Sequence, residues 1–137
     1  MIVLAKELKL PLVIHSRNNP NENNLPKNAV DDILSMTRGM KLLMHFYSGS
    51  EEQAKRIVED GGYISITHLR SKERRKVINI VPLNRLLVES DSPYVGRTPE
   101  SIRDAITYIA EVKDIEIAKV ADATCENAKK FFNFHLE

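Results

Sequence analysis

Four short segments of the chain each contain an apolar run, without the alternation of apolar and polar residues that marks a half-exposed strand. Strands of this kind are buried on both faces, which is the usual situation in a parallel sheet covered by helices. We therefore expect four parallel strands in one sheet. The segments span residues 11–15, 41–45, 62–67 and 84–91.

The stretches between these segments carry the spacing and the end signals of helices. Ser50 stands where an N-cap is expected, and Gly61 with Gly62 forms a helix stop. Thr98 followed by Pro99 predicts another helix start. Each connection is long enough for a right-handed crossover between parallel strands. After an N-terminal helix, we expect helices at 26–38, 50–62, 71–82 and 98–114, then two further helical pieces that separate near residues 122–124.

Length and composition limit the class of protein. A chain of 137 residues fits one domain, 1–137, and 42% hydrophobic with 28% charged residues is typical of a globular protein. A net charge of +1 provides no broad basic surface, so binding of nucleic acid would need a local site. The lone Cys125 favours a reducing compartment, and the apolar run before Lys6 is too short for a signal peptide or membrane span. We expect a cytoplasmic protein with no membrane partner.

Three of the four predicted strands end in a side chain that can bind a metal ion, namely His15, His45 and Asp91. The carboxyl ends of parallel strands are where sites assemble in α/β proteins. Neutral imidazole and carboxylate are good ligands for divalent ions. Each residue alone is a weak signal, because a strand-end histidine is more often structural and an Asp before Ser-Pro is often a turn former. Their joint occurrence predicts a metal site.

Four motifs occur in an order and spacing that resemble one family. They are LPLVIHSR at 10–17, MHFYSGSEEQAKRIVEDGGYISI at 44–66, VPLNRLLVESDSPY at 81–94 and ENAKKFF at 126–132. Together they resemble the TatD family of metal-dependent hydrolases and deoxyribonucleases, within the amidohydrolase-like barrels. The family's segments read similarly, as HSR, HCFSGS and LLVETDSPYL. The likeness extends over almost the whole chain, and the combination of motifs is highly specific.

The resemblance implies a role for each matching residue. His15 and His45 match metal-binding histidines, and Asp91 matches the aspartate that binds metal and activates the attacking water. Arg17 matches an arginine on the substrate side, where its fork of donors suits a phosphate. Tyr94 flanks the same site and is expected on the substrate side. The cofactors are then divalent ions, with Zn, Mg, Mn and Ni not distinguished by these ligands.

The resemblance covers only part of the family's architecture. A (β/α)8 barrel needs about 250 residues, so these 137 residues do not hold a whole one. The motifs resemble those of the second half, which implies four strands and their helices forming a partial TIM-like barrel. The first half supplies a His-x-His pair and a bridging glutamate in the family, and no His-x-His occurs in this chain. We expect either a fragment of a longer protein that lacks its N-terminal half or a natural half-domain.

These observations predict a metal-dependent hydrolase of the TatD deoxyribonuclease type that cleaves phosphodiester bonds in DNA and is incomplete in this chain. The alternative is a non-catalytic half-barrel that assembles as a homodimer or with another chain, because half a barrel leaves strand edges unpaired. His68 also follows a predicted strand, and we expect it on the surface or behind the ligands rather than on the metal.

Overall fold

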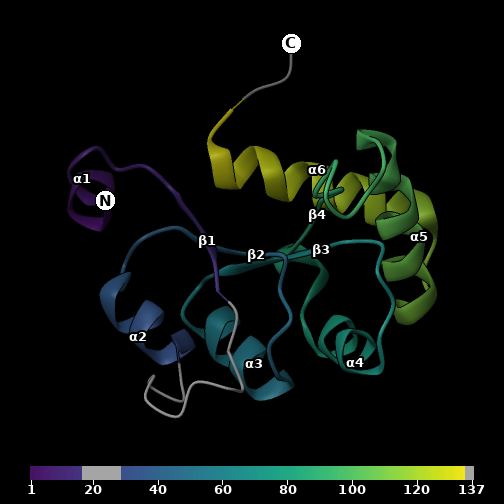
Figure 1. The fold of residues 1–137 in the computed structure, drawn as a ribbon, viewed down its shortest axis with the longest axis horizontal. Helices are drawn as coiled ribbons and strands as arrows, with labels where there is room; N and C mark the ends of the chain where they lie inside the picture. The colour runs from purple at the N-terminus through teal and green to yellow at the C-terminus, as the bar shows by residue number, and fades with distance from the viewer. Residues whose placement is uncertain (17–28, 135–137) are drawn as a thin grey trace.

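A computed structural model describes residues 1–16 and 29–134 of the chain. Four parallel strands form one sheet in the order β1-β2-β3-β4, as the apolar segments predicted (Figure 1). Sequential strands are neighbours and helices connect them, which is the arrangement found in (β/α) barrels. The predicted fold class is therefore confirmed. The strands span Leu12–His15 (β1), Leu42–His45 (β2), Tyr63–Ile66 (β3) and Leu86–Val88 (β4).

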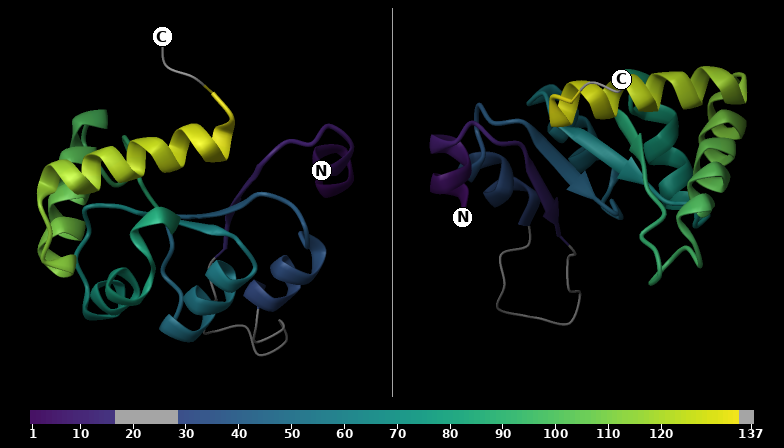
Figure 2. Two further views of the ribbon diagram at one scale, coloured as in Figure 1. Left: turned by 180° about the vertical axis from the view of Figure 1, so that it is seen from behind. Right: turned by 90° about the horizontal axis from the view of Figure 1, so that it is seen from above.

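Helices lie on both faces of the sheet. In Figure 1, α2, α3 and α4 lie below the sheet, α6 lies above it, and α5 stands beside β4. Figure 2 shows α1 at the β1 end, on the side away from α5. The α-helices span Ile2–Glu7 (α1), Ala29–Met36 (α2), Glu51–Glu59 (α3), Lys72–Ile80 (α4), Ile102–Lys113 (α5) and Ile117–Phe132 (α6), and short 3-10 turns span Leu83–Arg85 (η1) and Pro99–Ser101 (η2).

Alternate residues of each strand face opposite layers, and both layers are apolar. Met44 and Ile64 belong to the main core between the sheet and the outer helices, and both are almost fully buried. On the other face, Leu43 and Leu87 pack with the buried ring of Phe131 from α6. This double coverage explains why the strands lack an in–out alternation in sequence.

The helix α3 begins and ends where the sequence signals predicted. The Ser50 side chain accepts a hydrogen bond from the backbone N–H of Gln53, and the Gln53 side chain accepts one from the Ser50 N–H. This reciprocal pair satisfies two N–H groups that a helix start would leave unpaired. Gly61 follows the helix with a φ of +85°, a conformation that is available to glycine at little cost.

The predicted break near residues 122–124 is wrong, because α6 is one continuous helix of 16 residues. Thr124 is buried within it, and its hydroxyl donates to the carbonyl of Val120 in the preceding turn. The β-branched side chain is thus accommodated without ending the helix. The end of the preceding helix, expected at residue 114, is confirmed, because α5 ends at Lys113 and Asp114 adopts a left-handed conformation before α6.

Strand β1 lies at an edge of the sheet and, within the described part of the chain, pairs with β2 alone. Val13 in this strand is half exposed, and Leu4, Leu8 and Leu10 just before it are more than half exposed. Apolar surface is therefore concentrated at this end of the molecule. In the described ranges, no helix is long and apolar enough to cross a membrane.

Candidate metal site

His15 and His45 are the last residues of β1 and β2, and they stand opposite each other in the parallel register. Residues paired in this way point to the same face of a sheet. The two imidazole rings lie 5.6 Å apart between centroids, with an angle of 54° between their planes. The structure therefore brings these two side chains together at the carboxyl edge of the sheet, and their role as metal ligands stays a prediction.

Asp91 lies in the loop after β4, three residues beyond the end of the strand at Val88. The expectation that a strand extends to residue 91 is therefore wrong. Asp91 has a φ of +49°, and its carbonyl accepts a hydrogen bond from the N–H of Val95, so the chain turns here. Aspartate tolerates this left-handed conformation better than most residues. The turn brings Asp91 Oδ1 to 3.5 Å from His45 Nε2.

Glu89 is a member of the site that sequence reasoning missed. Its Oε2 lies 2.6 Å from His45 Nδ1 and accepts a 2.7 Å hydrogen bond from the hydroxyl of Ser65 in β3. Its Oε1 accepts a 2.7 Å hydrogen bond from the backbone N–H of Phe46. The available signal was its place as a carboxylate directly after a buried strand, two residues before Asp91.

Phe46 forms one wall of the site at a sharp turn of the chain. Its φ is +49°, and its ring stacks on the ring of His15 with centroids 6.1 Å apart and planes 15° apart. The guanidinium of Arg74 lies over the Phe46 ring, 5.5 Å from its centroid. Burial lowers the pKa of Arg74 from its ordinary value, because desolvation disfavours the charged form. The Phe46 ring thus contacts both a histidine of the candidate site and an arginine from α4.

Of the two predicted substrate-side residues, the structure describes only Tyr94. Tyr94 follows Asp91 by three positions and is 90% exposed. Arg17 lies outside the described residues. Their roles therefore stay predictions.

His68 is more enclosed than a surface residue. It follows β3 and is partly buried, and its Nδ1 is enclosed without a hydrogen-bond partner among the described residues. His68 is therefore not fully exposed, and the expected position behind the ligands stays a prediction.

The pair formed by His45 and Asp91 has the spacing that one divalent ion requires. Bonds of about 2.1 Å at a tetrahedral angle separate two ligand atoms by about 3.4 Å. The observed 3.5 Å between His45 Nε2 and Asp91 Oδ1 fits this spacing. In the part of the chain that the structure describes, no group of three or more His, Cys, Asp or Glu side chains forms a complete metal-holding set. Within the described residues, His15 therefore lies beside a pair of ligand atoms with fitting spacing, and its role as a third metal ligand stays a prediction.

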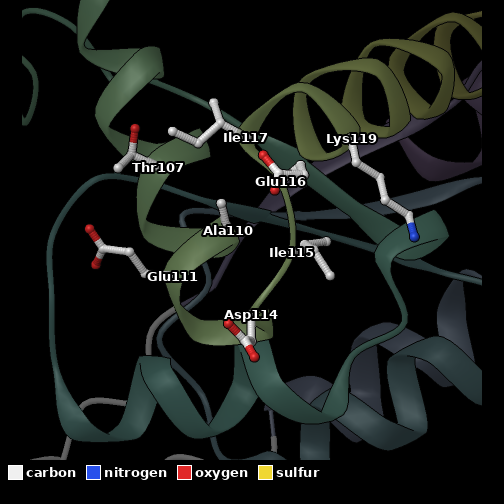
Figure 3. Close-up of a pocket in the computed structure, with 8 residues that line it drawn as sticks. All are labelled: Thr107, Ala110, Glu111, Asp114, Ile115, Glu116, Ile117 and Lys119. Carbon is white, nitrogen blue, oxygen red and sulfur yellow. The ribbon is translucent and has the colours of Figure 1, made fainter.

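A separate cavity of about 510 Å³ lies between α5 and the start of α6. Figure 3 shows that the carboxyl groups of Glu111, Asp114 and Glu116 around it point in different directions. Glu111 is also paired with Arg70 at 2.5 Å. Because these acids do not converge, the cavity lacks the donor geometry that an ion requires, and the histidine cluster remains the candidate site.

Comparison with known proteins identifies relatives along almost the whole chain. The uncharacterized metal-dependent hydrolase MJ1582 of Methanocaldococcus jannaschii is 32% identical over 97% of this chain and 53% of its own length. The deoxyribonuclease TATDN3 of Homo sapiens is 33% identical over 96% of this chain and 48% of its own length. The chain thus spans about half the length of the curated relatives it matches.

Solved structures show the same fold. The TatD homologue YJJV of Escherichia coli superimposes with a TM-score of 0.80 and 26% identity, over 98% of this chain and 54% of that one. A TatD family hydrolase of Entamoeba histolytica gives a TM-score of 0.79 at 20% identity, over 96% and 54% of the two chains. The family model described as TatD related DNase matches residues 1–133. The chain belongs to the TatD family.

Proposed function

We propose that the chain forms part of a metal-dependent hydrolase of the TatD type, which cleaves phosphodiester bonds in DNA with metal-activated water. The observation that carries this proposal is the approach of His45 Nε2 and Asp91 Oδ1 to 3.5 Å beside the His15 ring. The names of two relatives, a metal-dependent hydrolase and a deoxyribonuclease, support the same activity.

Each residue of the cluster has a role in the proposed reaction. His15, His45 and Asp91 hold a divalent ion, and this ligand set accepts Zn, Mn, Ni or Mg. Such an ion, when bound, polarises a phosphoryl oxygen and lowers the pKa of a water molecule. Asp91 also orients the attacking water and takes up its proton. Arg17 and Tyr94 contact the substrate in this proposal, with the arginine on a phosphate.

The test is cleavage of a fluorescent DNA duplex with added Mn²⁺, compared between the wild type and Asp91→Ala. We expect EDTA to abolish cleavage and Asp91→Ala to reduce it at least 100-fold, since one general base contributes about 10²–10⁴ in rate. Asp104→Ala is the matched control, because Asp104 is an exposed carboxylate on α5. Equal activity in the wild type and Asp91→Ala would rule out the assignment.

We also propose that the protein acts in the cytoplasm. Cys125 is exposed and is the only cysteine of the chain, as suits a reducing compartment. Fractionation of cells that express the tagged chain tests this, and recovery from the medium would contradict it.

A second candidate is a half-barrel that assembles with another copy of itself or with another chain and has no catalytic activity alone. It is favoured by the free edge of β1 and by the half-exposed Val13 on that strand, because an uncovered apolar edge tends to pair. Light scattering at micromolar concentration distinguishes these states. A mass of two chains that falls to one in Val13→Lys supports the homodimer, and a wild-type monomer without metal-dependent cleavage points to a separate partner chain.

A further inference from the structure

The carboxylate of Glu89 is held by donors from two neighbouring strands. It contacts His45 Nδ1 at 2.6 Å, the Ser65 hydroxyl at 2.7 Å and the backbone N–H of Phe46 at 2.7 Å. Its side chain is only 15% exposed. A side chain held at both oxygens in this way has one orientation, so it can impose a geometry on the ring that it contacts.

This geometry has a consequence for the proton of His45. A neutral imidazole carries a proton on one nitrogen and a lone pair on the other, and a carboxylate only accepts hydrogen bonds. The contact with Glu89 Oε2 therefore places the proton on Nδ1. The lone pair is left on Nε2, the nitrogen that faces Asp91 at 3.5 Å.

We propose that Glu89 is the positioning residue of the site. It fixes His45 as the Nδ1–H tautomer and presents the lone pair of Nε2 toward Asp91. Tighter metal binding follows only if the proposed function holds, whereas the tautomer is a property of the metal-free protein. A merely structural role, in which Glu89 only secures the Phe46 turn, would not determine which nitrogen of His45 carries the proton.

The variant that tests this role most directly is Glu89→Gln, which keeps the size of the side chain but has a single acceptor oxygen. If that oxygen accepts from Phe46 N–H, the amide NH₂ meets His45 Nδ1 and donates to it. The ring then carries its proton on Nε2. Glu111→Gln is the matched control, because Glu111 is a carboxylate on α5 that pairs with Arg70.

The readout is the ¹⁵N chemical shifts of the neutral His45 ring in metal-free protein labelled at histidine, assigned with His45→Ala. We expect the Nδ1–H tautomer in the wild type and in Glu111→Gln, and the Nε2–H tautomer in Glu89→Gln. An Nε2–H tautomer in the wild type overturns the proposal, even if Glu89→Gln fails to fold. An unchanged tautomer in folded Glu89→Gln overturns it as well.

A zinc titration against a chromogenic chelator separates this inference from the proposed function. We expect Glu89→Gln to bind Zn²⁺ about 10–100-fold more weakly than the wild type, which is the usual effect of removing a group that orients a histidine ligand. A tautomer change without any zinc binding by the wild type would contradict the proposed function and support the positioning role. Tight zinc binding by the wild type and by Glu89→Gln, with the same His45 tautomer in both, would support the proposed metal site and contradict the positioning role.

Discussion

Asn127 shows how one polar side chain in the core fixes the start of a strand. It is 3% exposed, and its amide donates hydrogen bonds of 2.8 Å to the carbonyls of Leu83 and Leu86. These carbonyls belong to the turn η1 and to the first residue of β4, the strand that leads to Glu89 and Asp91. The amide of α6 therefore anchors the segment that delivers the two acids.

Replacing Asn127 with Ala removes a donor from the buried carbonyl of Leu86 and from the part-buried carbonyl of Leu83, which also accepts from the backbone N–H of Leu86. We expect the free energy of unfolding to fall by about 1–3 kcal/mol, which is the cost of unsatisfied buried polar groups. Urea denaturation measures the change. Asn79→Ala, at an exposed position of α4, should alter the free energy by less than about 0.5 kcal/mol. Equal losses in the two variants would show that the Asn127 bonds contribute no net stability.

Among single residues, the sequence predicted the histidines that end two strands and missed Glu89, the carboxylate that contacts one of them. His15 and His45 follow buried apolar runs, so their position at the sheet edge could be predicted. Glu89 acts through hydrogen bonds to β2 and β3, and contacts between strands leave no periodic pattern in the sequence. The roles of Arg17 and Tyr94 still rest on the motif match.

Among the elements, α3 has the best-defined start, because Ser50 and Gln53 cap it reciprocally. The loop before it is also secured, since the Tyr47 hydroxyl donates to the Ser50 carbonyl at 2.8 Å. Burial raises the pKa of Tyr47 above its ordinary value, which keeps the phenol protonated as a donor. The loop after His45 is therefore tied by this hydrogen bond to the N-cap of α3.

Removal of the cap tests this account of α3. Ser50→Ala should lower the free energy of unfolding by about 1 kcal/mol, since the N–H of Gln53 loses its acceptor. Ser101→Ala is the control, because Ser101 precedes α5 without a side-chain capping bond. Thermal unfolding followed by circular dichroism compares the two. A loss in Ser101→Ala as large as that in Ser50→Ala would contradict the capping argument.

The packing of α6 across the sheet gives a second prediction about an element. Phe131 is fully buried against Leu43 and Leu87, and its ring meets that of Tyr63 edge-on at 5.4 Å between centroids. Phe131→Ala should cost about 3–5 kcal/mol of stability through lost burial and a cavity. Chemical denaturation gives the value, and Phe134→Ala, at a 40% exposed position, should cost far less.

Elements with strong local signals were predicted well, and those decided by tertiary contacts were not. Long apolar runs located all four strands, and capping residues located the start of α3. The end of β4 was placed too late because the turn at Asp91 depends on backbone hydrogen bonds within the loop. The break expected near Thr124 was wrong because that side chain is buried and bonded within α6.

For the whole molecule, the alternation of apolar runs and helical segments was enough to predict a parallel α/β sheet. A partial barrel was predicted because 137 residues are too few for eight strand–helix units. The chain spans about half the length of the relatives it matches. In the described part of the chain, β1 has one strand neighbour and no complete metal-holding group is formed. From these two observations we predict that the isolated chain binds a divalent ion more weakly than a complete barrel whose site has additional ligands.

The central claim is that His15, His45 and Asp91 together bind a divalent ion. Its most direct test is the Zn²⁺ affinity of the folded wild type, His15→Ala, His45→Ala and His68→Ala, measured by competition with a chelator. We predict that the first two variants each lose at least about tenfold in affinity, whereas His68→Ala retains the wild-type value. Equal affinity in all four proteins, or a loss confined to His68→Ala, would contradict the account.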